Sequence, residues 1–261
     1  MKSLVARRRH PLALALLLLF ALAAVAGIYA VASASAPAIA SDSTQTQVEE
    51  GKKLYLEGCS SCHGLGAEGT VNGPTLIGVG AAAVDFQVSS GRMPLAAPGA
   101  QAQAGPAMYD EKEVAQLAAY VASLAPGPQI PTAEDLNTDN VDVALGGLLF
   151  RTNCAQCHQA AGGGGALTQG KYAPSLMGSE PKEIWEAMVT GPQSMPVFSD
   201  SSITPDDKRA IIAYIEELQT SASPGGLDLG RIGPVTETVF LFTAVAAALA
   251  FAAIWIGMKA R

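Results

Sequence analysis

Two long runs of apolar residues lie near the two ends of the chain, and the pattern between them is polar or amphipathic. The first run, 12–32, has 21 residues, the second, 239–258, has 20, and neither contains a charged side chain. A helix of about 20 apolar residues crosses the hydrocarbon core of a membrane. The pattern therefore predicts a membrane helix at each end and excludes an ordinary cytosolic protein.

The 206 residues between these runs, 33–238, contain one pattern twice. The segment 48–55 matches 143–150 at an offset of 95, and 117–124 matches 211–218 at an offset of 94. Apolar residues within each segment follow helical spacing. The repeat predicts two small helical domains, each with an opening and a closing helix.

The loop between the helices also repeats, because 73–78 matches 173–178 at an offset of 100. The five extra residues of the second copy fall at the glycine run 162–165, which indicates a loop insertion. The predicted division is an N-terminal anchor or signal segment 1–40, a first domain 45–127, a linker 128–139, a second domain 140–221, a juxtamembrane segment 222–238 and a C-terminal membrane helix 239–261.

A glycine stands at the same position in both opening helices, as Gly51 and Gly146. Without a side chain, each would let the opening helix cross the closing helix closely. The aromatic residues one turn further on are then expected to pack in pairs, Tyr55 with Tyr120 and Phe150 with Tyr214.

The central region is strongly acidic. It holds all 23 acidic residues but only 10 of the 16 basic ones, which gives it a net charge of −13. Proteins that bind nucleic acid need basic patches, so the charge argues against that class. Attraction to a basic partner and simple solubility both explain such a surface.

The basic residues at the ends predict the topology. Three arginines at 7–9 precede the first run, while Lys259 and Arg261 follow the second. Because positive residues stay on the cytoplasmic side, both termini are expected inside and the acidic region outside. The protein is thus expected to be a multi-pass protein of the plasma membrane. Alternatively, the first run is a signal peptide cleaved near Ala36.

All four cysteines belong to two C-x-x-C-H motifs, the attachment signal of c-type haem. We therefore expect two covalently bound haem c groups, with the adjacent histidines as iron ligands. A zinc site is the first alternative, but its second cysteine pair usually lies within about 20 residues, whereas 91 intervene here. A redox dithiol, the second, does not need the histidine. The residues concerned are Cys59, Cys62, His63, Cys154, Cys157 and His158.

The second axial ligand follows by elimination. Of the three histidines, two belong to the motifs and His10 precedes the first apolar run. Every cysteine is also used, which leaves methionine sulfur, a ligand that raises the reduction potential. Met195 is the candidate in the second domain. Met93 is the candidate in the first, where an insertion at 96–105 would explain its distance from the closing helix, and Met108 is the alternative.

A helix ending in C-x-x-C-H, then a proline, then Met-Pro and an aromatic helix resembles class I cytochromes c over roughly 45–221. With the C-terminal span and the stretch 226–237 before it, the chain resembles the dihaem cytochrome c subunit of the actinobacterial cytochrome bcc complex, a menaquinol:cytochrome c reductase. The resemblance implies an all-α fold of two tandem cytochrome c domains between the two membrane helices. It implies partners too: a cytochrome b subunit, a Rieske iron–sulfur subunit and a terminal haem-copper oxidase.

In that family electrons pass from the Rieske centre to the copper site of the oxidase, so the chain would be an electron carrier within an enzyme complex. The resemblance also implies that the carbonyls of Pro74 and Pro174 accept a hydrogen bond from the ligand histidines; both are otherwise turn prolines. Arg92 is interpreted as a solvated side chain rather than a propionate ligand. Trp185 is interpreted as a core residue rather than part of a haem pocket.

Three other functions stay open. The first is the dihaem subunit of a cbb-type oxidase or of a membrane-associated dehydrogenase. A dihaem peroxidase is a second possibility, but it needs a haem with an open ligand position. A haem-binding structural anchor for an oxidase is a third.

Overall fold

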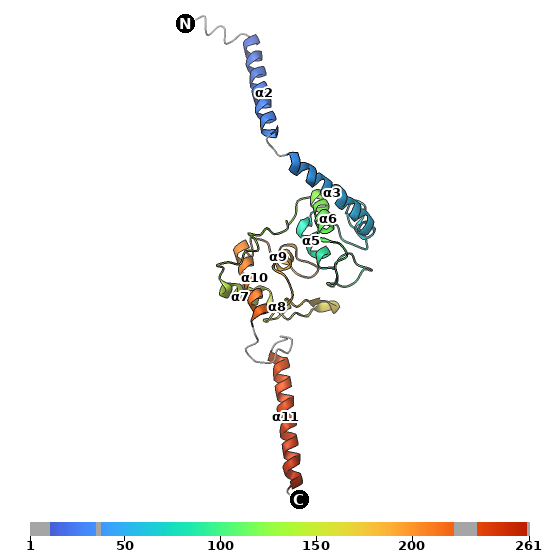
Figure 1. Cartoon of the computed structure of the whole chain (residues 1–261), viewed down its shortest axis with the longest axis vertical. Helices are drawn as coiled ribbons and strands as arrows, with labels where there is room; N and C mark the ends of the chain where they lie inside the picture. Colours follow the sequence, from blue (N-terminus) through green and yellow to red (C-terminus); the bar gives the residue numbers. More distant parts are fainter. Residues whose placement is uncertain (1–10, 35–37, 222–233, 260–261) are drawn as a thin grey trace. The chain divides into compact units, whose positions relative to one another are not determined.

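The computed structural model describes residues 11–34, 38–221 and 234–259 and is mostly helical (Figure 1). The chain divides into two compact units, 1–47 and 48–261. The first contains α2 (Pro11–Ala34) and the start of α3 (Ala38–Gly58). The predictions made for the N-terminal arginines, for a cleavage site near Ala36 and for 222–233 lie outside the described residues.

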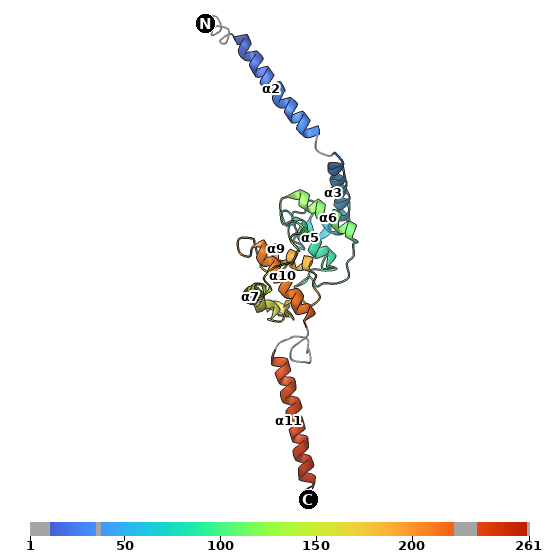
Figure 2. The same cartoon turned by 60° about the vertical axis from the view of Figure 1, so that its left-hand side comes forward.

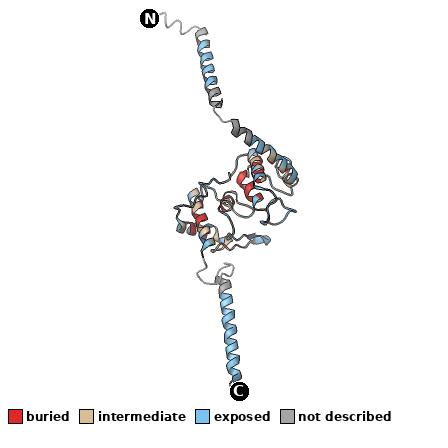
Figure 3. Ribbon diagram, in the orientation of Figure 1, coloured by how far each residue is buried: buried red, intermediate tan, exposed pale blue. Residues whose placement is uncertain are grey.

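One helix within the described residues is long and apolar enough to cross a membrane. It is Thr238–Lys259, part of α11 (Pro234–Lys259), with a mean hydropathy of 2.5. Its described side chains are exposed along the whole length (Figure 3). The described apolar stretch of α2, Ala15–Gly27, is shorter. The structure thus supports the C-terminal membrane helix, and the N-terminal one stays a prediction.

The first haem-motif region is built from the end of α3, α4 (Ser60–His63), α5 (Gly80–Ser89) and α6 (Glu111–Leu124). α6 begins with a capping box: the Glu113 amide donates to Asp110 Oδ1 and the Asp110 amide donates to Glu113 Oε2, both at 2.9 Å. Its apolar face packs on α3 and α5. The buried side chains of this core include Tyr55, Leu117, Tyr120 and Val121.

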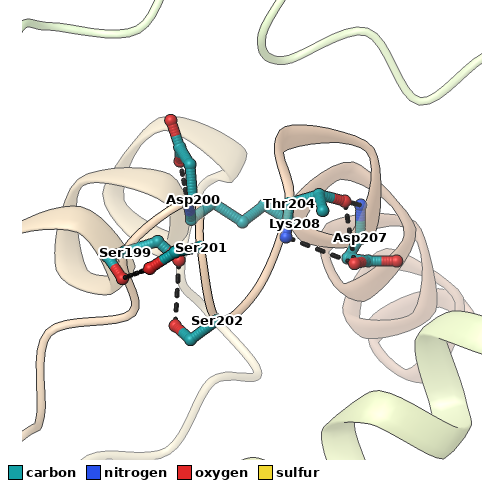
Figure 4. Close-up of polar contacts among 7 residues, drawn as sticks. All are labelled: Ser199, Asp200, Ser201, Ser202, Thr204, Asp207 and Lys208. Atoms are coloured by element: carbon teal, nitrogen blue, oxygen red, sulfur yellow. Dashed lines mark hydrogen bonds and ion pairs between the residues drawn. The ribbon is translucent and has the colours of Figure 1, made fainter.

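The second region repeats the plan with α7 (Val143–Asn153), α8 (Ala155–His158), α9 (Pro181–Thr190) and α10 (Pro205–Thr220). Thr204 caps α10 and pairs with Asp207, and Pro205 occupies the first turn. Figure 4 shows the fully buried Lys208 extending from this turn to Asp200 in the preceding loop, at 2.5 Å. These contacts fix the start of the closing helix.

The predicted glycine crossings are confirmed in both halves. A Cβ placed on Gly51 would lie 1.9 Å from the carbonyl oxygen of Gln116, and one on Gly146 would lie 1.9 Å from that of Ala210. The expected aromatic pairs form as well. The ring centroids are 5.2 Å apart for Tyr55 and Tyr120 and 5.5 Å apart for Phe150 and Tyr214.

The expectation of a purely helical fold needs one correction. β1 (Gly165–Ala166) and β2 (Tyr172–Ala173) pair antiparallel, with the short 3-10 helix η1 (Thr168–Gly170) between them. The insertion after the glycine run is long enough for the chain to fold back on itself here. From the sequence this insertion was expected to form only a loop.

The two halves meet through equivalent helices, α5 of the first and α9 of the second, which lie side by side (Figures 1 and 2). The ammonium group of Lys182 on α9 lies 2.5 Å from Asp85 Oδ2 on α5. The Asp85 side chain is almost fully buried, whereas the Lys182 side chain is 40% exposed, so the ion pair lies at the edge of the interface. The haem-motif regions thus share an interface.

We predict that Gly146→Ala lowers the free energy of unfolding by about 1–3 kcal/mol, the usual cost of overpacking. The added methyl group would collide with backbone, which cannot rotate away as a side chain does. Denaturant unfolding of the haem-loaded chain in detergent measures the effect. The matched control is Gly178→Ala, because no atom lies within 4 Å of a Cβ there. Equal stability of the two variants would contradict the role of the crossing.

Candidate functional site

The first C-x-x-C-H motif lies where α3 ends. Cys59 follows the last residue of α3, and α4 carries the rest of the motif to His63. His63 Nδ1 lies 2.7 Å from the carbonyl oxygen of Pro74. The fully buried Tyr55 hydroxyl donates to the Gly64 carbonyl at 2.6 Å, which ties the end of the motif to the core.

The second motif has the same construction at the end of α7. α8 ends at His158, whose Nδ1 lies 3.0 Å from the carbonyl oxygen of Pro174. Burial lowers the pKa of His158, and the Pro174 carbonyl partly offsets this by favouring the protonated ring. At neutral pH Nδ1 therefore donates to the carbonyl and Nε2 keeps a free lone pair, the state that binds a metal ion.

The thiols do not have the character of redox-active cysteines. Burial raises the pKa of Cys154 to about 11, with a further contribution from Cys157. Burial likewise raises the pKa of Cys59, with a contribution from Cys62. A redox dithiol needs a lowered pKa so that a thiolate forms, and these thiols stay protonated at neutral pH.

A cavity adjoins the first motif, and we call it the first cavity. Its wall includes Cys59, His63, Pro74 and Met93. Cys62 is not part of the wall, and Met108 is 72% exposed and also stands apart. Of the two methionine candidates, the structure brings only Met93 together with the histidine.

A second cavity adjoins the second motif. Its wall includes both cysteines of the motif, His158, Pro174 and Met195. Met188 on α9 lines it too, although its side chain is 2% exposed and belongs to the core. Trp185 is buried in the core and is not part of the wall, in agreement with the packing role expected from the sequence.

These two cavities suit haem c by their donor chemistry. Each offers a motif cysteine, a histidine whose ring orientation is set by a carbonyl, and a methionine sulfur. The remaining wall is largely apolar, as a porphyrin face requires. Bound there, the haems would be held by the motif cysteines and by the two histidines.

Each cavity is also lined by residues of the other half, which the sequence analysis missed. Phe86, Arg92 and Gln101 of the first half line the second cavity. Val189 and Gly191 of the second half line the first. The only hint in the sequence was the long insertion at 96–105, and it did not indicate that these residues would line the second cavity.

Comparison with known proteins agrees with this geometry. The family model described as "Cytochrome c" matches residues 48–125, and the one described as "Cytochrome C oxidase, cbb3-type, subunit III" matches 141–215. The cytochrome bc1 complex cytochrome c subunit of Corynebacterium efficiens is 44% identical over 227 residues, 81% of this chain and 77% of the relative. That of Mycobacterium tuberculosis is 41% identical over 218 residues, 81% of this chain and 78% of the relative.

This chain belongs to the family of cytochrome bc1 complex cytochrome c subunits. The family resemblance expected from the sequence is confirmed. The chain has two cytochrome c domains, each with its own haem-attachment motif.

A buried carboxyl group lies close to the interface between the two domains. Glu186 on α9 is fully buried, and burial followed by the nearby Asp85 raises its pKa to about 9. Lys182 acts in the opposite direction, and Glu183 adds to the rise. In this cytochrome c subunit Glu186 is therefore protonated and neutral at pH 7.

Glu186 makes the stability depend on pH in a predictable direction. Between the ordinary pKa of 4.5 and the folded value of about 9, the folded state keeps a proton that the unfolded state releases. Its contribution is therefore fully present below pH 4.5 and is lost as pH rises toward 9. We predict that Glu186→Gln flattens this decline, whose limiting slope is about 1.4 kcal/mol per pH unit.

Unfolding of the haem-loaded chain at pH 5, 7 and 9 measures the slope. Glu217→Gln is the control, because Glu217 lies exposed on α10 and its removal should leave the slope as it was. A Glu186→Gln protein with the pH dependence of the unmodified chain would contradict the assignment.

Proposed function

We propose that this chain is the dihaem electron-transfer subunit of a respiratory quinol–cytochrome c reductase. It passes electrons from a Rieske iron–sulfur centre to a terminal haem-copper oxidase. The observation that carries the proposal is the paired donor set: a carbonyl-oriented histidine and a methionine line each of two cavities. The enzymatic activity belongs to the complex, and this chain is its carrier.

Each type of residue in a cavity has a separate role in binding the haem. Cys59, Cys62, Cys154 and Cys157 would hold the two haems through thioethers. His63 and His158 would offer Nε2 to the iron, and Met93 and Met195 would offer sulfur. Bound haem supplies one-electron chemistry at its iron. The Pro74 and Pro174 carbonyls hold the imidazoles in orientation.

The cavity walls set the redox properties. Leu117 and Val121 line the first cavity, and Ile211 and Ile215 line the second, all almost fully buried. An apolar, shielded site disfavours the extra charge of the oxidised centre, and a methionine ligand raises the potential further. Both effects suit a carrier late in an oxidising chain.

The surroundings fit an extracytoplasmic subunit of a membrane complex. Thr238–Lys259 would hold the chain in the plasma membrane, and the N-terminal run would add a second span. The partners are a cytochrome b subunit and a Rieske subunit within the complex, and the oxidase beyond it. The acidic central region, with a net charge of −13, favours basic contact surfaces on them.

A second candidate is the dihaem subunit of a cbb-type oxidase. The match of 141–215 to the family model of cbb3-type subunit III favours it. That match covers the second half alone, whereas the relatives from bc1 complexes cover 81% of the chain. The reductase subunit is therefore the better-supported proposal.

We predict that Met195→Leu and Met93→Leu each remove one sulfur ligand while both haems stay covalently attached. The potential of the affected haem should fall, and a species that binds carbon monoxide should appear. The weak near-infrared band of ferric methionine ligation should lose about half its intensity, since one of two sulfur ligands is gone. Optical spectra and potentiometric titration measure these changes.

A conservative control sharpens this test. Met108→Leu changes an exposed methionine that stands apart from the first cavity, so it should not alter ligation. If Met108→Leu produces the carbon-monoxide-reactive species, Met93 is not the ligand. Alkaline pyridine spectra count the haems, and fewer than two per chain would contradict the dihaem assignment.

We further predict that the tagged chain, purified from membranes in mild detergent, brings cytochrome b and a Rieske protein with it. Added quinol should reduce its haems, and Met195→Leu should slow oxygen uptake by the same membranes because the lower potential opposes electron flow. Mass spectrometry and oxygen-electrode traces provide the measurements. Copurification with oxidase subunits alone, without quinol reduction, would favour the cbb-type alternative.

A further inference from the structure

The second cavity contains a cation from the other half of the molecule. Arg92 immediately precedes Met93 in the chain. Arg92 nevertheless lines the second cavity, whereas Met93 lines the first. Its guanidinium carbon lies 4.7 Å from the centroid of the Phe86 ring, which also lines the second cavity. This stacking holds the side chain against the wall.

The electrostatic setting leaves Arg92 available for an anion. It is the single Lys or Arg among the described residues of this wall, and Glu183 is the single acid. The Glu183 carboxylate attracts Arg92 electrostatically, but it accepts from the Glu180 amide at 3.3 Å in the capping box of α9 and forms no ion pair with Arg92 among the described residues. A half-buried guanidinium gains most from a carboxylate that it can bind with two parallel hydrogen bonds.

We infer that Arg92 binds a propionate carboxylate of the haem attached to Cys154 and Cys157, so that the first domain completes the haem site of the second. The inference rests on the proposed function, because it requires a haem in that cavity. Haem carries two carboxylates, and burying one next to an apolar wall is costly without a cation. The wall of the second cavity offers Arg92 for that purpose.

Two glutamine clamps hold the first-domain segment in place beside this cavity. Gln101 donates to the Tyr172 carbonyl at 2.7 Å and accepts from the Tyr172 amide at 2.8 Å. Gln193 donates to the Ala102 carbonyl at 2.8 Å and accepts from the Ala102 amide at 3.0 Å. Each side-chain amide thus bridges to the backbone of the other half. Both are positioning residues for the segment that follows Arg92.

The charge of Arg92 has a defined effect on the second haem. A nearby cation opposes the oxidised, more positive state and offsets the propionate charge that favours it. Removing the cation should therefore lower the potential of the second haem. The first haem, although it is next to Arg92 along the chain, should keep its potential.

The decisive experiment is Arg92→Gln in the full-length, haem-loaded chain. Potentiometric titration follows both haems, and the second is identified by its response to Met195→Leu. We expect the ratio of oxidised to reduced second haem at fixed ambient potential to rise tenfold, which is 59 mV for a one-electron couple. The first haem should not shift.

Three comparisons make the result specific. Arg151→Gln removes the same charge from the second domain, but Arg151 is exposed and does not line the cavity, so no shift is expected. Arg92→Lys keeps the charge and loses the paired hydrogen bonds, so a smaller fall of the second haem is expected. Gln101→Ala should lower the potential of the second haem as well.

Other outcomes would overturn the inference. A shift of the first haem on Arg92→Gln would place the arginine in the first site, and unchanged potentials of both haems would show that it binds no propionate. If Arg92→Gln does not assemble, Arg92→Lys and Gln101→Ala decide by the same readout. Failure of the proposed function is distinguishable, because the unmodified chain would then lack two covalent haems or would not be reduced by quinol.

Discussion

The close crossing of two helices in each half is the constraint on which the haem sites depend. At Gly146 a Cβ would lie 1.9 Å from the Ala210 carbonyl oxygen, so backbone packs directly on backbone. This approach brings Phe150 against Tyr214 and fixes the end of α7, from which the second motif continues. The His158 ring then needs only one carbonyl, that of Pro174, to set its orientation.

Two copies of one pattern do not make two independent haem sites in this chain. The Pro192–Gln193 segment lines both cavities, and the first-half insertion at 96–105 forms part of the wall of the second. At this boundary the side-chain amides of Gln101 and Gln193 each form a pair of hydrogen bonds with the backbone of the other half. The environment of each site is therefore set jointly, and the longer loop of the first half accounts for the asymmetry.

Most of the features predicted correctly from the sequence depend on short stretches of the chain. The C-x-x-C-H motifs, the glycines at the helix crossings and the core position of Trp185 follow from residue type and spacing, and contacts within one half suffice for them. Arg92 was interpreted from the sequence as a solvated side chain, whereas in the structure it is half-buried and lines the second cavity. Which cavity the Arg92 side chain lines depends on how the two halves pack, and residue type and spacing do not reveal that packing. The β1–β2 pair was missed because a glycine-rich insertion permits many backbone paths.

Polar contacts help to specify how the two halves pack. The buried Asp85 carboxylate pairs with the partly exposed Lys182 between α5 and α9, and Glu186 lies buried and neutral close by. Desolvation offsets much of the attraction in such a pair, so its net contribution to stability is small. A sliding of the two helices would nevertheless leave the Asp85 charge buried and unpaired, which costs far more. The interface therefore favours one register, and this register brings both cavities against the Pro192–Gln193 segment.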